Sequence, residues 1–544
     1  MASRSFQGPK GTRDLYPEDM LRRRYIIQSW RDTSIRHGFE EIEGPTFEEA
    51  ELYAVKSGEG ILGELFQAFS GKSPEEVAQV QETGRAPFAM RPEFTPTLAR
   101  MYAARARQLT KPTRWFMAGP FFRAERPQRG RLREFLQWNA DVLGSDDQMV
   151  DRADVVSVLL ASIEEVGLIG HSALETNGAG SVTLRYNDRR WTEGMLDWAG
   201  VDAASKPAVI ALLDRYKKYN SRDSFESDLG QIVSSSLIAQ YITDRLEDER
   251  LRVAEESDQA EYKELMLQRM KQFNLRRRDD PDRIREFGAY SDEDIVAPEA
   301  RAFVDSLTER GFSDWLTFDG SIVRGLAYYT GTVFEVIAEG ERAVAGGGRY
   351  DKLIELLGGP PTPAVGFAMG DVVLSLLLED KGLMPEGPQL MDAVSRRPAS
   401  VRPEAFVIGA NDETSDTLVR RLVADLRRGV ESKSYQDKAD DRKPWQADRY
   451  EPASDGVRPM HARSSDKSTR NVKKLLGDAS RQNAKFAVII HDTPDVADRV
   501  QLKDLDGQRD LTPADIPGLP TDKAEFSVDT ASDVYVGRAI AAIS

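Results

Sequence analysis

The clearest hydrophobic pattern in the chain is a strict apolar–polar alternation in the stretch that runs up to Gly144. Its apolar positions are Leu136, Trp138, Ala140 and Val142. Its polar positions carry only amides and a carboxylate, on Gln137, Asn139 and Asp141. Alternation with a period of two predicts a β-strand that buries one face. The short polar groups suit the floor of a pocket, although the pattern by itself also fits a surface strand.

A basic loop connects this strand to an earlier apolar run that starts at Trp115, so the two runs are expected to pair as strands. The loop contains five arginines, namely Arg123, Arg126, Arg129, Arg131 and Arg133, and two acids, Glu125 and Glu134. Guanidinium groups bind phosphate oxygens in pairs. Arginines beside a polar strand face therefore predict an anionic ligand at this place.

Three further regions are predicted to be helical. One helix begins at Pro17 and continues along an apolar stripe to a stop at Gly38. Residues 151–166 carry a second apolar stripe, which predicts a core helix. From about 190 to 300 the chain is charged and rich in long side chains, which indicates an inserted helical module. Acids follow its basic run at 276–278, so a solvated face is favoured there over contact with RNA.

The pattern changes near residue 383. Residues 383–403 contain four prolines and little periodicity, which indicates a linker. Beyond it, short apolar strands alternate with an amphipathic helix, and an Asp506-Gly507 turn predicts a hairpin. This alternation predicts a small mixed sheet with helices packed on it. Residues 433–470 are polar and poor in apolar side chains, so an extended or partly disordered insertion is expected.

Composition bounds the possible functions. With 544 residues, the chain should form two or more domains. Because it has no Cys, disulfides and zinc–thiolate sites are excluded, and its four His are too scattered to predict a metal site. No apolar run approaches 18 residues, which predicts a cytoplasmic protein without a membrane partner. The net charge of −16 means that any RNA partner must bind a local basic patch.

Three more stretches carry candidate ligand chemistry. In residues 90–100, a carboxylate on Glu93 and a hydroxyl on Thr95 are groups that can hold an ammonium ion. Residues 321–337 form a glycine-containing turn with two tyrosines that runs into a strand, where core or interface is the usual role of such a pair. Residues 345–359 are dense in glycine, which allows a ligand to approach the backbone closely.

Taken together, these motifs resemble one family. The loop FRAERPQRGRLREF resembles motif 2 of class II aminoacyl-tRNA synthetases, in particular of histidyl-tRNA synthetases. The helix and strand up to Pro45 resemble motif 1, RPEFT the amino-group loop, RGLAYYTGTVFE and GGRYD the two histidine motifs, and PAVGFAMG motif 3.

The resemblance implies an α+β fold. The expected architecture is an antiparallel-sheet catalytic domain with a helical insertion, followed by a C-terminal α/β anticodon-binding domain. The expected boundaries are 1–190 for the first part of the catalytic core, 191–300 for the insertion, 301–385 for the second part of the core, 386–403 for a linker and 404–544 for the last domain.

The resemblance also implies activity and site residues. It implies ATP-dependent activation of L-histidine, with Mg²⁺ accompanying ATP, transfer to tRNA(His), and a homodimer. Arg123 and Arg324 are the implied catalytic residues, facing the α-phosphate from two sides. The implied histidine-binding residues are Glu93, Phe94, Thr95, Arg123, Gln137, Asp141, Arg324, Tyr328, Tyr329 and Tyr350. The implied ATP-binding residues are Arg123, Glu125 and Arg131, and no dedicated metal site is expected.

Three positions depart from the family pattern. Asp141 stands where the family usually has Glu, Ala327 where it usually has Asp, and Val373 where an Arg usually binds the γ-phosphate. One hypothesis is that Arg131 takes over the γ-phosphate. The lost arginine leaves open a histidine-binding regulatory paralogue, which controls ATP phosphoribosyltransferase without aminoacylating. A third alternative is an RNA-binding protein with an inactive synthetase core.

Overall fold

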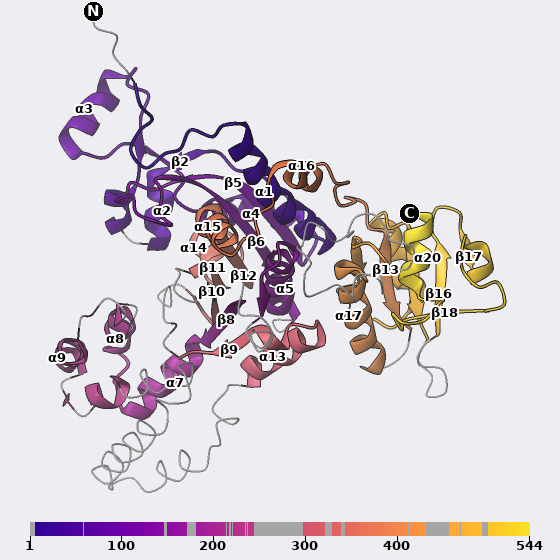
Figure 1. Cartoon of the computed structure of the whole chain (residues 1–544). Coiled ribbons are helices and arrows are strands. Elements are labelled where there is room, and N and C mark those ends of the chain that lie inside the picture. Colours follow the sequence, from indigo (N-terminus) through magenta and orange to yellow (C-terminus); the bar gives the residue numbers. More distant parts are fainter. Residues whose placement is uncertain are drawn as a thin grey trace, which may run out of the picture.

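The structure described here is a computed structural model. It describes residues 6–57, 59–145, 150–170, 181–213, 215–216, 219, 221–233, 235–236, 238–243, 298–320, 322, 329–338, 343–410, 413–430, 456–467, 469–491 and 499–544. Figure 1 shows a larger N-terminal body and a smaller C-terminal body, each built around a β-sheet. Over the described ranges, no helix combines the length and the apolar character that crossing a membrane requires.

A nine-stranded sheet forms the centre of the N-terminal body. Its order is β1-β5-β6-β12-β11-β10-β8-β7, and β9 pairs with β8. The strands are β1 (Glu40–Glu41), β5 (Thr113–Phe122), β6 (Glu134–Leu143), β7 (Ile169–Gly170), β8 (Ser181–Asp188), β9 (Leu316–Phe318), β10 (Thr332–Ala338), β11 (Ala343–Arg349) and β12 (Ala364–Gly370). Every pairing from β5 across to β8 is antiparallel. The predicted α+β class with an antiparallel catalytic sheet is therefore confirmed.

The predicted pairing around the basic loop is also confirmed. Strands β5 and β6 pair along their whole length, with Gly119 opposite Gln137 and Trp115 opposite Asp141. The alternation in β6 divides its side chains as expected, because Leu136 and Trp138 enter the main hydrophobic cluster. Gln137 and Asp141 then point to the opposite face of the sheet.

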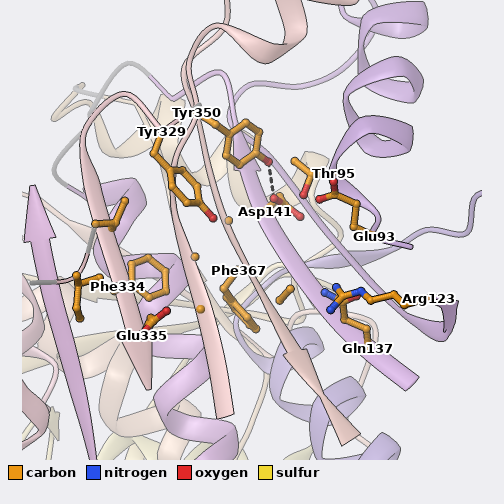
Figure 2. A pocket seen from close by; sticks show the side chains of 16 residues that line it. Glu93, Thr95, Arg123, Gln137, Asp141, Tyr329, Phe334, Glu335, Tyr350 and Phe367 are labelled. Carbon is orange, nitrogen blue, oxygen red and sulfur yellow. Dashed lines mark hydrogen bonds between the residues drawn. The ribbon is translucent and has the colours of Figure 1, made fainter. Parts of the chain in front are cut away.

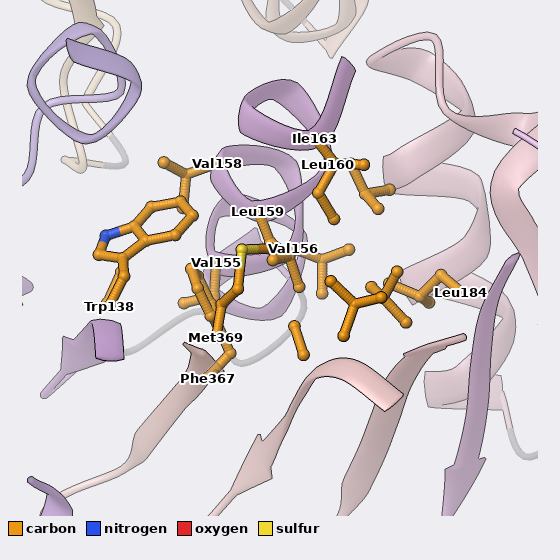
Figure 3. Packing of buried hydrophobic residues seen from close by; sticks show 14 of the residues in the cluster. Trp138, Val155, Val156, Val158, Leu159, Leu160, Ile163, Leu184, Phe367 and Met369 are labelled. Carbon is orange, nitrogen blue, oxygen red and sulfur yellow. The ribbon is translucent and has the colours of Figure 1, made fainter. Parts of the chain in front are cut away.

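Helices cover one face of this sheet and bury the main core. They are α1 (Pro17–Arg36), α5 (Val150–Glu165), α13 (Pro298–Glu309) and α15 (Asp371–Asp380). Figure 3 shows valines and leucines of α5 above Trp138, Phe367 and Met369. Trp138 is fully buried, stacks on Trp30 of α1 with ring centroids 5.9 Å apart, and donates from Nε1 to Ser34 Oγ at 3.0 Å. Each such buried side chain contributes roughly 1.5–3 kcal/mol.

Smaller elements lie against the other face. Helices α4 (Thr95–Arg105) and α14 (Leu353–Leu356) share a second cluster that includes Phe94, Tyr102 and Tyr350. A three-stranded sheet, ordered β2-β4-β3, adjoins them. It consists of β2 (Phe47–Glu49), β3 (Gln67–Ala68) and β4 (Phe88–Met90), with α2 (Ala50–Ser57), a 3₁₀ turn (Glu59–Glu64) and α3 (Pro74–Thr83) nearby.

The linker predicted at 386–403 contains a helix, which corrects the expectation of an irregular segment. Helix α16 (Gly387–Val394) packs against α1 and buries Leu390. Pro388 lies in its first turn, where proline does not interrupt helical hydrogen bonding. The Ala399 N–H donates to Asp32 Oδ1 at 3.1 Å, so the chain beyond α16 is also attached to α1. The apolar stripe of α16 is too short to recognise in the sequence, and the surrounding prolines indicate an irregular segment instead.

The described part of the insertion is helical. Helices α7 (Arg189–Ala199), α8 (Lys206–Leu213) and α9 (Arg222–Val233) bury a small core of their own, including Leu196, Val209 and Phe225. Figure 1 shows α8 and α9 set to one side of the large sheet. Residues 244–297, including the basic run at 276–278, lie outside the described residues. The domain boundaries themselves stay predictions.

The C-terminal body contains the mixed sheet that the sequence predicted. Its order is β14-β13-β15-β16-β17, with β18 beside β16, and it has parallel and antiparallel pairs. Helices α17 (Glu413–Arg428) and α20 (Val536–Ile543) cover one face, and α19 (Val472–Arg481) covers the other. The strands are β13 (Ala405–Gly409), β14 (Ala462–Ser464), β15 (Phe486–Ile490), β16 (Arg499–Asp504), β17 (Arg509–Leu511) and β18 (Phe526–Ser527).

Two expectations in this body need comment. The hairpin around Asp506-Gly507 is confirmed, because β16 and β17 pair with Asp504 opposite Arg509. The polar insertion predicted at 433–470 is only partly extended loop, because β14 pairs with β13 inside it and Ala462 is fully buried. An edge strand of three residues was too short for the sequence pattern to reveal. Residues 431–455 lie outside the described residues.

Candidate functional site

The face of the large sheet opposite α5 carries a pocket whose floor is formed by β6, β12, β11 and β10. The register places Asp141 of β6 opposite Gly366 of β12, and Gly366 opposite Gly348 of β11. Glu335 of β10 lies opposite Gly346. Glycines therefore occupy the middle strands, so backbone forms the centre of the floor and larger side chains form its rim.

Gly366 is required by the side chain across from it. A Cβ at this position would lie 1.7 Å from Oδ1 of Asp141. No heavy-atom contact of that kind is possible, so only glycine lets the Asp141 carboxylate lie flat against β12. The glycine in the GFAMG stretch thus shapes the acidic end of the pocket.

The acidic end of the pocket is formed by two buried side chains, Asp141 and Tyr350. The Tyr350 hydroxyl donates a hydrogen bond to Asp141 Oδ1, and the two side chains are 1% and 4% exposed. Burial, together with the negative charge and hydrogen bond of Asp141, raises the pKa of Tyr350 well above its usual value. Tyr350 therefore stays protonated and acts as a hydrogen-bond donor. Tyr329 lies beside them, with its ring over Gly348 (Figure 2).

Glu93 precedes α4 and Thr95 is its first residue, and Figure 2 shows both near the Tyr350–Asp141 pair. Arg91 holds the turn before α4 in place from below. Its fully buried side chain donates to the Pro120 carbonyl at 2.8 Å and to Glu43 Oε1 at 2.7 Å. A charged guanidinium bonded to both chain segments gives the turn a fixed position against β5. The structure thus presents a carboxylate and a hydroxyl on a rigid support.

Gln137 and Arg123 line another part of the pocket, where Figure 2 shows them side by side. Arg123 follows β5, donates from Nε to the Pro92 carbonyl at 3.1 Å, and lies 5.0 Å from the ring centroid of Phe135. Gln137 is 6% exposed, and its Oε1 has no hydrogen-bond partner among the described residues. A buried amide oxygen without a partner is costly unless a ligand or water supplies a donor.

These side chains surround one cavity of about 280 Å³, which Figure 2 shows from close by. Seven of the residues predicted from the sequence line it, and they come from four separate segments of the chain. The full lining is Glu93, Thr95, Arg123, Gln137, Asp141, Ile322, Tyr329, Val333, Phe334, Glu335, Gly346, Gly347, Tyr350, Gly366, Phe367 and Ala368.

Other predicted residues lie elsewhere. Phe94 is 1% exposed and packs edge-on against Phe121 in the core, so it supports the pocket instead of lining it. Glu125 and Arg131 form an ion pair with each other in the loop between β5 and β6, outside the cavity lining. Arg324, Ala327 and Tyr328 lie outside the described residues.

Val373, where the family resemblance predicts an arginine, takes part in core packing. Val373 is half-buried and packs against the main core at the start of α15. Two residues earlier, Asp371 accepts a hydrogen bond from the Leu136 N–H at 2.8 Å and pairs with Arg13 at 2.7 Å. The first turn of α15 is therefore engaged with β6 and with the N-terminal segment.

Sequence reasoning missed several residues of the lining. Glu335 adds a third carboxylate to those of Glu93 and Asp141, and Val333, Phe334, Phe367 and Ile322 add apolar surface. Glu335 ends the RGLAYYTGTVFE stretch and lies two residues after Val333 in β10, so the strand period places both side chains on the same face. Ile322 gave no such signal, because it belongs to no described strand or helix.

No candidate metal centre accompanies the pocket in the described part of the chain. No group of three or more His, Asp or Glu is arranged there to hold an ion. The charged groups that do line the cavity are the Glu93, Asp141 and Glu335 carboxylates and the Arg123 guanidinium. They can bind a small zwitterionic ligand directly, through charge-assisted hydrogen bonds.

An antiparallel sheet that carries an arginine-rich loop and a small polar pocket on one face is the catalytic architecture of a class II aminoacyl-tRNA synthetase. Comparison with known proteins gives the family. The family model described as histidyl-tRNA synthetase matches residues 11–215 and 266–371. The histidine–tRNA ligase of Opitutus terrae is 34% identical over 391 residues, which cover 71% of this chain and 78% of that protein. The chain belongs to the histidyl-tRNA synthetase family, an enzyme family of histidine–tRNA ligases.

Two solved structures are similar at lower identity. Histidyl-tRNA synthetase from Nostoc sp. PCC 7120 is 19% identical with a TM-score of 0.49, over 94% of this chain and 97% of that one. An ATP phosphoribosyltransferase regulatory subunit/histidyl-tRNA synthetase from Bacillus halodurans C is 16% identical with a TM-score of 0.48, over 90% and 99%. Neither likeness bears on the choice between a synthetase and a regulator.

Proposed function

We propose that this protein activates L-histidine with ATP and transfers it to the 3′ end of tRNA(His). The observation that carries the proposal is the convergence of seven side chains, from four motif-bearing segments, on one cavity of about 280 Å³. This volume suits a small metabolite, since drug-sized ligands occupy pockets of roughly 300–1,000 Å³. The cavity lining also offers carboxylate, hydroxyl and amide groups, which can pair with the ammonium and imidazole groups of histidine.

The proposed binding mode pairs these polar groups with the ammonium and imidazole groups of histidine. Glu93 and Thr95 accept hydrogen bonds from the α-ammonium group. Gln137, Asp141, Tyr329 and Tyr350 read the imidazole ring. Asp141 accepts an N–H of the ring while it keeps its bond from Tyr350. An amino acid without such a donor would leave these buried groups unpaired, so the site rejects it.

The proposed chemistry is transfer at phosphorus. A carboxylate oxygen of histidine forms a bond to the α-phosphorus of ATP while the bond to the β-phosphate oxygen breaks, which releases pyrophosphate. Arg123 stabilises the developing charge from one side, and Arg324 does so from the other on the strength of the family resemblance. The protein contributes position and positive charge, without a covalent nucleophile. A ribose hydroxyl of tRNA then attacks the histidyl carbonyl, and AMP leaves.

ATP, its metal and the assembly are part of the same proposal. The adenine and phosphates would lie along the loop between β5 and β6, near Arg123, Glu125 and Arg131, and Mg²⁺ would enter as part of the ATP substrate. We also propose a cytoplasmic homodimer, because α1 and β1 resemble the dimer-forming motif 1. Sedimentation equilibrium of the purified protein measures the assembly state, and a monomer at micromolar concentration would contradict it.

The decisive experiment is histidine-dependent exchange of labelled pyrophosphate into ATP. We expect exchange with histidine alone among the amino acids, and a loss of at least 100-fold in Arg123→Ala, since an electrostatic donor at the reacting group contributes about 10²–10³-fold. Aminoacylation of a tRNA(His) transcript tests the second step. Exchange with another amino acid in place of histidine would refute the substrate assignment.

One observation favours a second candidate, the regulatory paralogue. Val373 packs against the core where the family has its γ-phosphate arginine, so this cation is absent from the start of α15. A regulator would bind histidine in the same pocket without activating it. Calorimetric binding of histidine together with no detectable exchange would support this candidate and overturn the first.

A further inference from the structure

A second cavity, which we call the interdomain cleft, lies between the N-terminal body and the C-terminal body. It encloses about 1510 Å³ and is walled by the end of α1, the start of β5 and α5 on one side, and by α17 and β14 on the other. Eleven Lys and Arg side chains line it, against five Asp and Glu side chains. The chain as a whole has 74 basic and 90 acidic residues, so this cleft opposes the overall charge.

Ion pairs neutralise much of the wall but not its centre. Arg420 pairs with Glu309, Arg428 with Glu164, and Arg470 with Asp416. At the centre, Arg427 and Arg463 form no ion pair within the described residues. Carbonyl and neutral side-chain groups hold them instead.

The bonds of these two arginines are specific. Arg427 donates to the Ala462 carbonyl at 3.0 Å and to the His37 carbonyl at 3.4 Å. Arg463 donates to the Gly38 carbonyl at 3.0 Å, to Gln482 Oε1 at 3.1 Å and to His461 Nε2 at 3.0 Å. Both residues come from the C-terminal body and both reach the end of α1, so they line the seam between the two bodies.

Two more arginines raise the local charge further. Arg114 is shared between Asp154 and Asp466, and Arg310 also pairs with Asp154. The four guanidinium groups thus lie near three carboxylates, Asp154, Asp466 and Glu40, of which Glu40 attracts Arg463 without forming an ion pair. Burial, together with the charges of Arg114, Arg310 and Arg463, lowers the pKa of Arg427 to about 9, although Asp154 opposes the shift. Partly buried cations that repel one another are stabilised by an added anion, and phosphate matches the guanidinium fork.

We propose that the interdomain cleft is an anion site in which Arg427 and Arg463 bind a phosphate group. The group comes either from the backbone of an RNA or from free phosphate or pyrophosphate, because the recognising chemistry is the same. Its charge would offset the excess of guanidinium groups over carboxylates in this cluster. Since Arg427 and Arg463 also hold the end of α1, an occupied site would fasten the C-terminal body to the sheet-bearing body.

The first arm of the test uses free anions on the full-length protein. Thermal unfolding is compared in inorganic phosphate, in pyrophosphate and in chloride at equal ionic strength. Binding at 100 times Kd multiplies the folding equilibrium constant about 100-fold, which raises the midpoint. We expect this rise in the wild type and its loss in Arg427→Gln/Arg463→Gln. Arg402→Gln/Arg509→Gln, which removes two exposed arginines of the same body outside the cleft lining, should keep it.

The second arm uses a tRNA transcript and measures Kd against salt. If RNA supplies the phosphate, the Arg427→Gln/Arg463→Gln variant should bind roughly 10-fold or more weakly and lose about two units of salt slope. Hydrogen exchange on the wild type is the safeguard against a folding defect, since bound anion should slow exchange in β14. Two results together would overturn the proposal. In the wild type, phosphate and pyrophosphate would neither raise the midpoint nor slow exchange in β14. In the RNA arm, the Arg427→Gln/Arg463→Gln variant would bind the transcript as tightly as the wild type does. Histidine-dependent pyrophosphate exchange does not involve this cleft, so it tests the proposed function separately.

Discussion

The Tyr350 hydroxyl donates its hydrogen bond to Oδ1 of Asp141, and this bond joins the end of β11 to β6 across the floor of the pocket. Neither side chain has appreciable solvent contact. A buried carboxylate needs such a donor, because desolvation otherwise favours its neutral form. Asp141 is shorter than the glutamate usual in the family. Its carboxylate packs directly against Gly366, and this contact restricts its position. In the proposed function, the Tyr350–Asp141 pair would hold an acceptor in place for the imidazole before histidine binds.

Replacing Tyr350 by Phe removes this donor and leaves Asp141 short of one charge-assisted bond. Such bonds contribute about 1.5–3 kcal/mol, so kcat/KM for histidine in pyrophosphate exchange should fall roughly 10- to 150-fold. Tyr535→Phe is the matched control. Its buried hydroxyl has no hydrogen-bond partner in the described part of the chain, and it lies in the C-terminal core. Equal losses in both variants would mean that the pair has no special role.

Gly366→Ala tests whether the position of the Asp141 carboxylate matters for histidine binding. The new Cβ would occupy the position of the carboxylate, at 1.7 Å from Oδ1, so Asp141 must turn away. We expect histidine binding to become undetectable by calorimetry, with only moderate loss of thermal stability. Gly370→Ala, on the same strand, meets nothing closer than 3.9 Å and should bind histidine as the wild type does. Normal binding by Gly366→Ala would show that Asp141 does not contact the ligand.

Gln137→Leu separates binding from stability. Because Oε1 of Gln137 is buried without a described partner, the empty protein loses no hydrogen bond when leucine replaces it. The thermal midpoint should stay the same or rise. The KM for histidine should rise about 10-fold, as expected for one lost hydrogen bond to the ligand. A fall in the midpoint with an unchanged KM would identify Gln137 as a structural residue.

Arg131→Ala tests whether Arg131 binds the γ-phosphate of ATP, since Val373 stands where the resemblance predicts the arginine for that role. Arg131 now pairs with Glu125, and this pair would open when ATP arrives. If Arg131 then binds the γ-phosphate, KM for ATP should rise about 10-fold or more, whereas KM for histidine should not change. Arg129→Ala is the control, because Arg129 belongs to the same loop but pairs with Asp380 on α15. An unchanged ATP requirement in Arg131→Ala would exclude this role.

Periodicity and turn signals predict β6, its pairing with β5, and a strand at the end of residues 321–337, whereas β11 and β12 are not predicted as strands. In β6 every second side chain is short and polar, and the structure places two of them, Gln137 and Asp141, in the cavity lining. Glu93, Thr95, Arg123, Tyr329 and Tyr350 were found through motif resemblance, and the fold brings them together. The same motif did not distinguish Phe94, which faces the core, because a loop has no period from which a side chain's direction can be read.

Helix α16 and the interdomain cleft could not be predicted from the sequence, because both depend on contacts between distant segments. Helix α16 has only one strongly buried leucine, Leu390, so its stability comes from packing against α1 instead of from its own pattern. The interdomain cleft is a clearer case. Its walls come from two distant parts of the chain, α1 and β5 near the N-terminus and α17 and β14 in the C-terminal body, and no single stretch of sequence is strongly basic. Only the assembled structure reveals the excess of positive charge.

Asp32 makes stability depend on pH. It lies in α1 at 1% exposure, and burial raises its pKa from 3.8 to about 6, although Arg36 and the Ala399 N–H oppose the shift. The folded protein therefore holds a proton that the unfolded chain releases between about pH 4 and pH 6. Stability contributed by this group is present below pH 4 and is lost as pH rises to 6. The loss is on the order of 1–3 kcal/mol.

Asp32→Asn should remove this dependence. The amide oxygen can still accept from the Ala399 N–H, while the buried charge is gone. We expect the thermal midpoint of the variant to exceed that of the wild type by a few degrees at pH 7.5 and to match it at pH 4, since 1 kcal/mol shifts the midpoint of a large domain by about 2–4 °C. Asp522→Asn, at an exposed position, should leave the midpoint unchanged at both values. A variant that is less stable than the wild type at pH 7.5 would mean that the Asp32 charge is favourable, because its attraction to Arg36 outweighs the cost of burial.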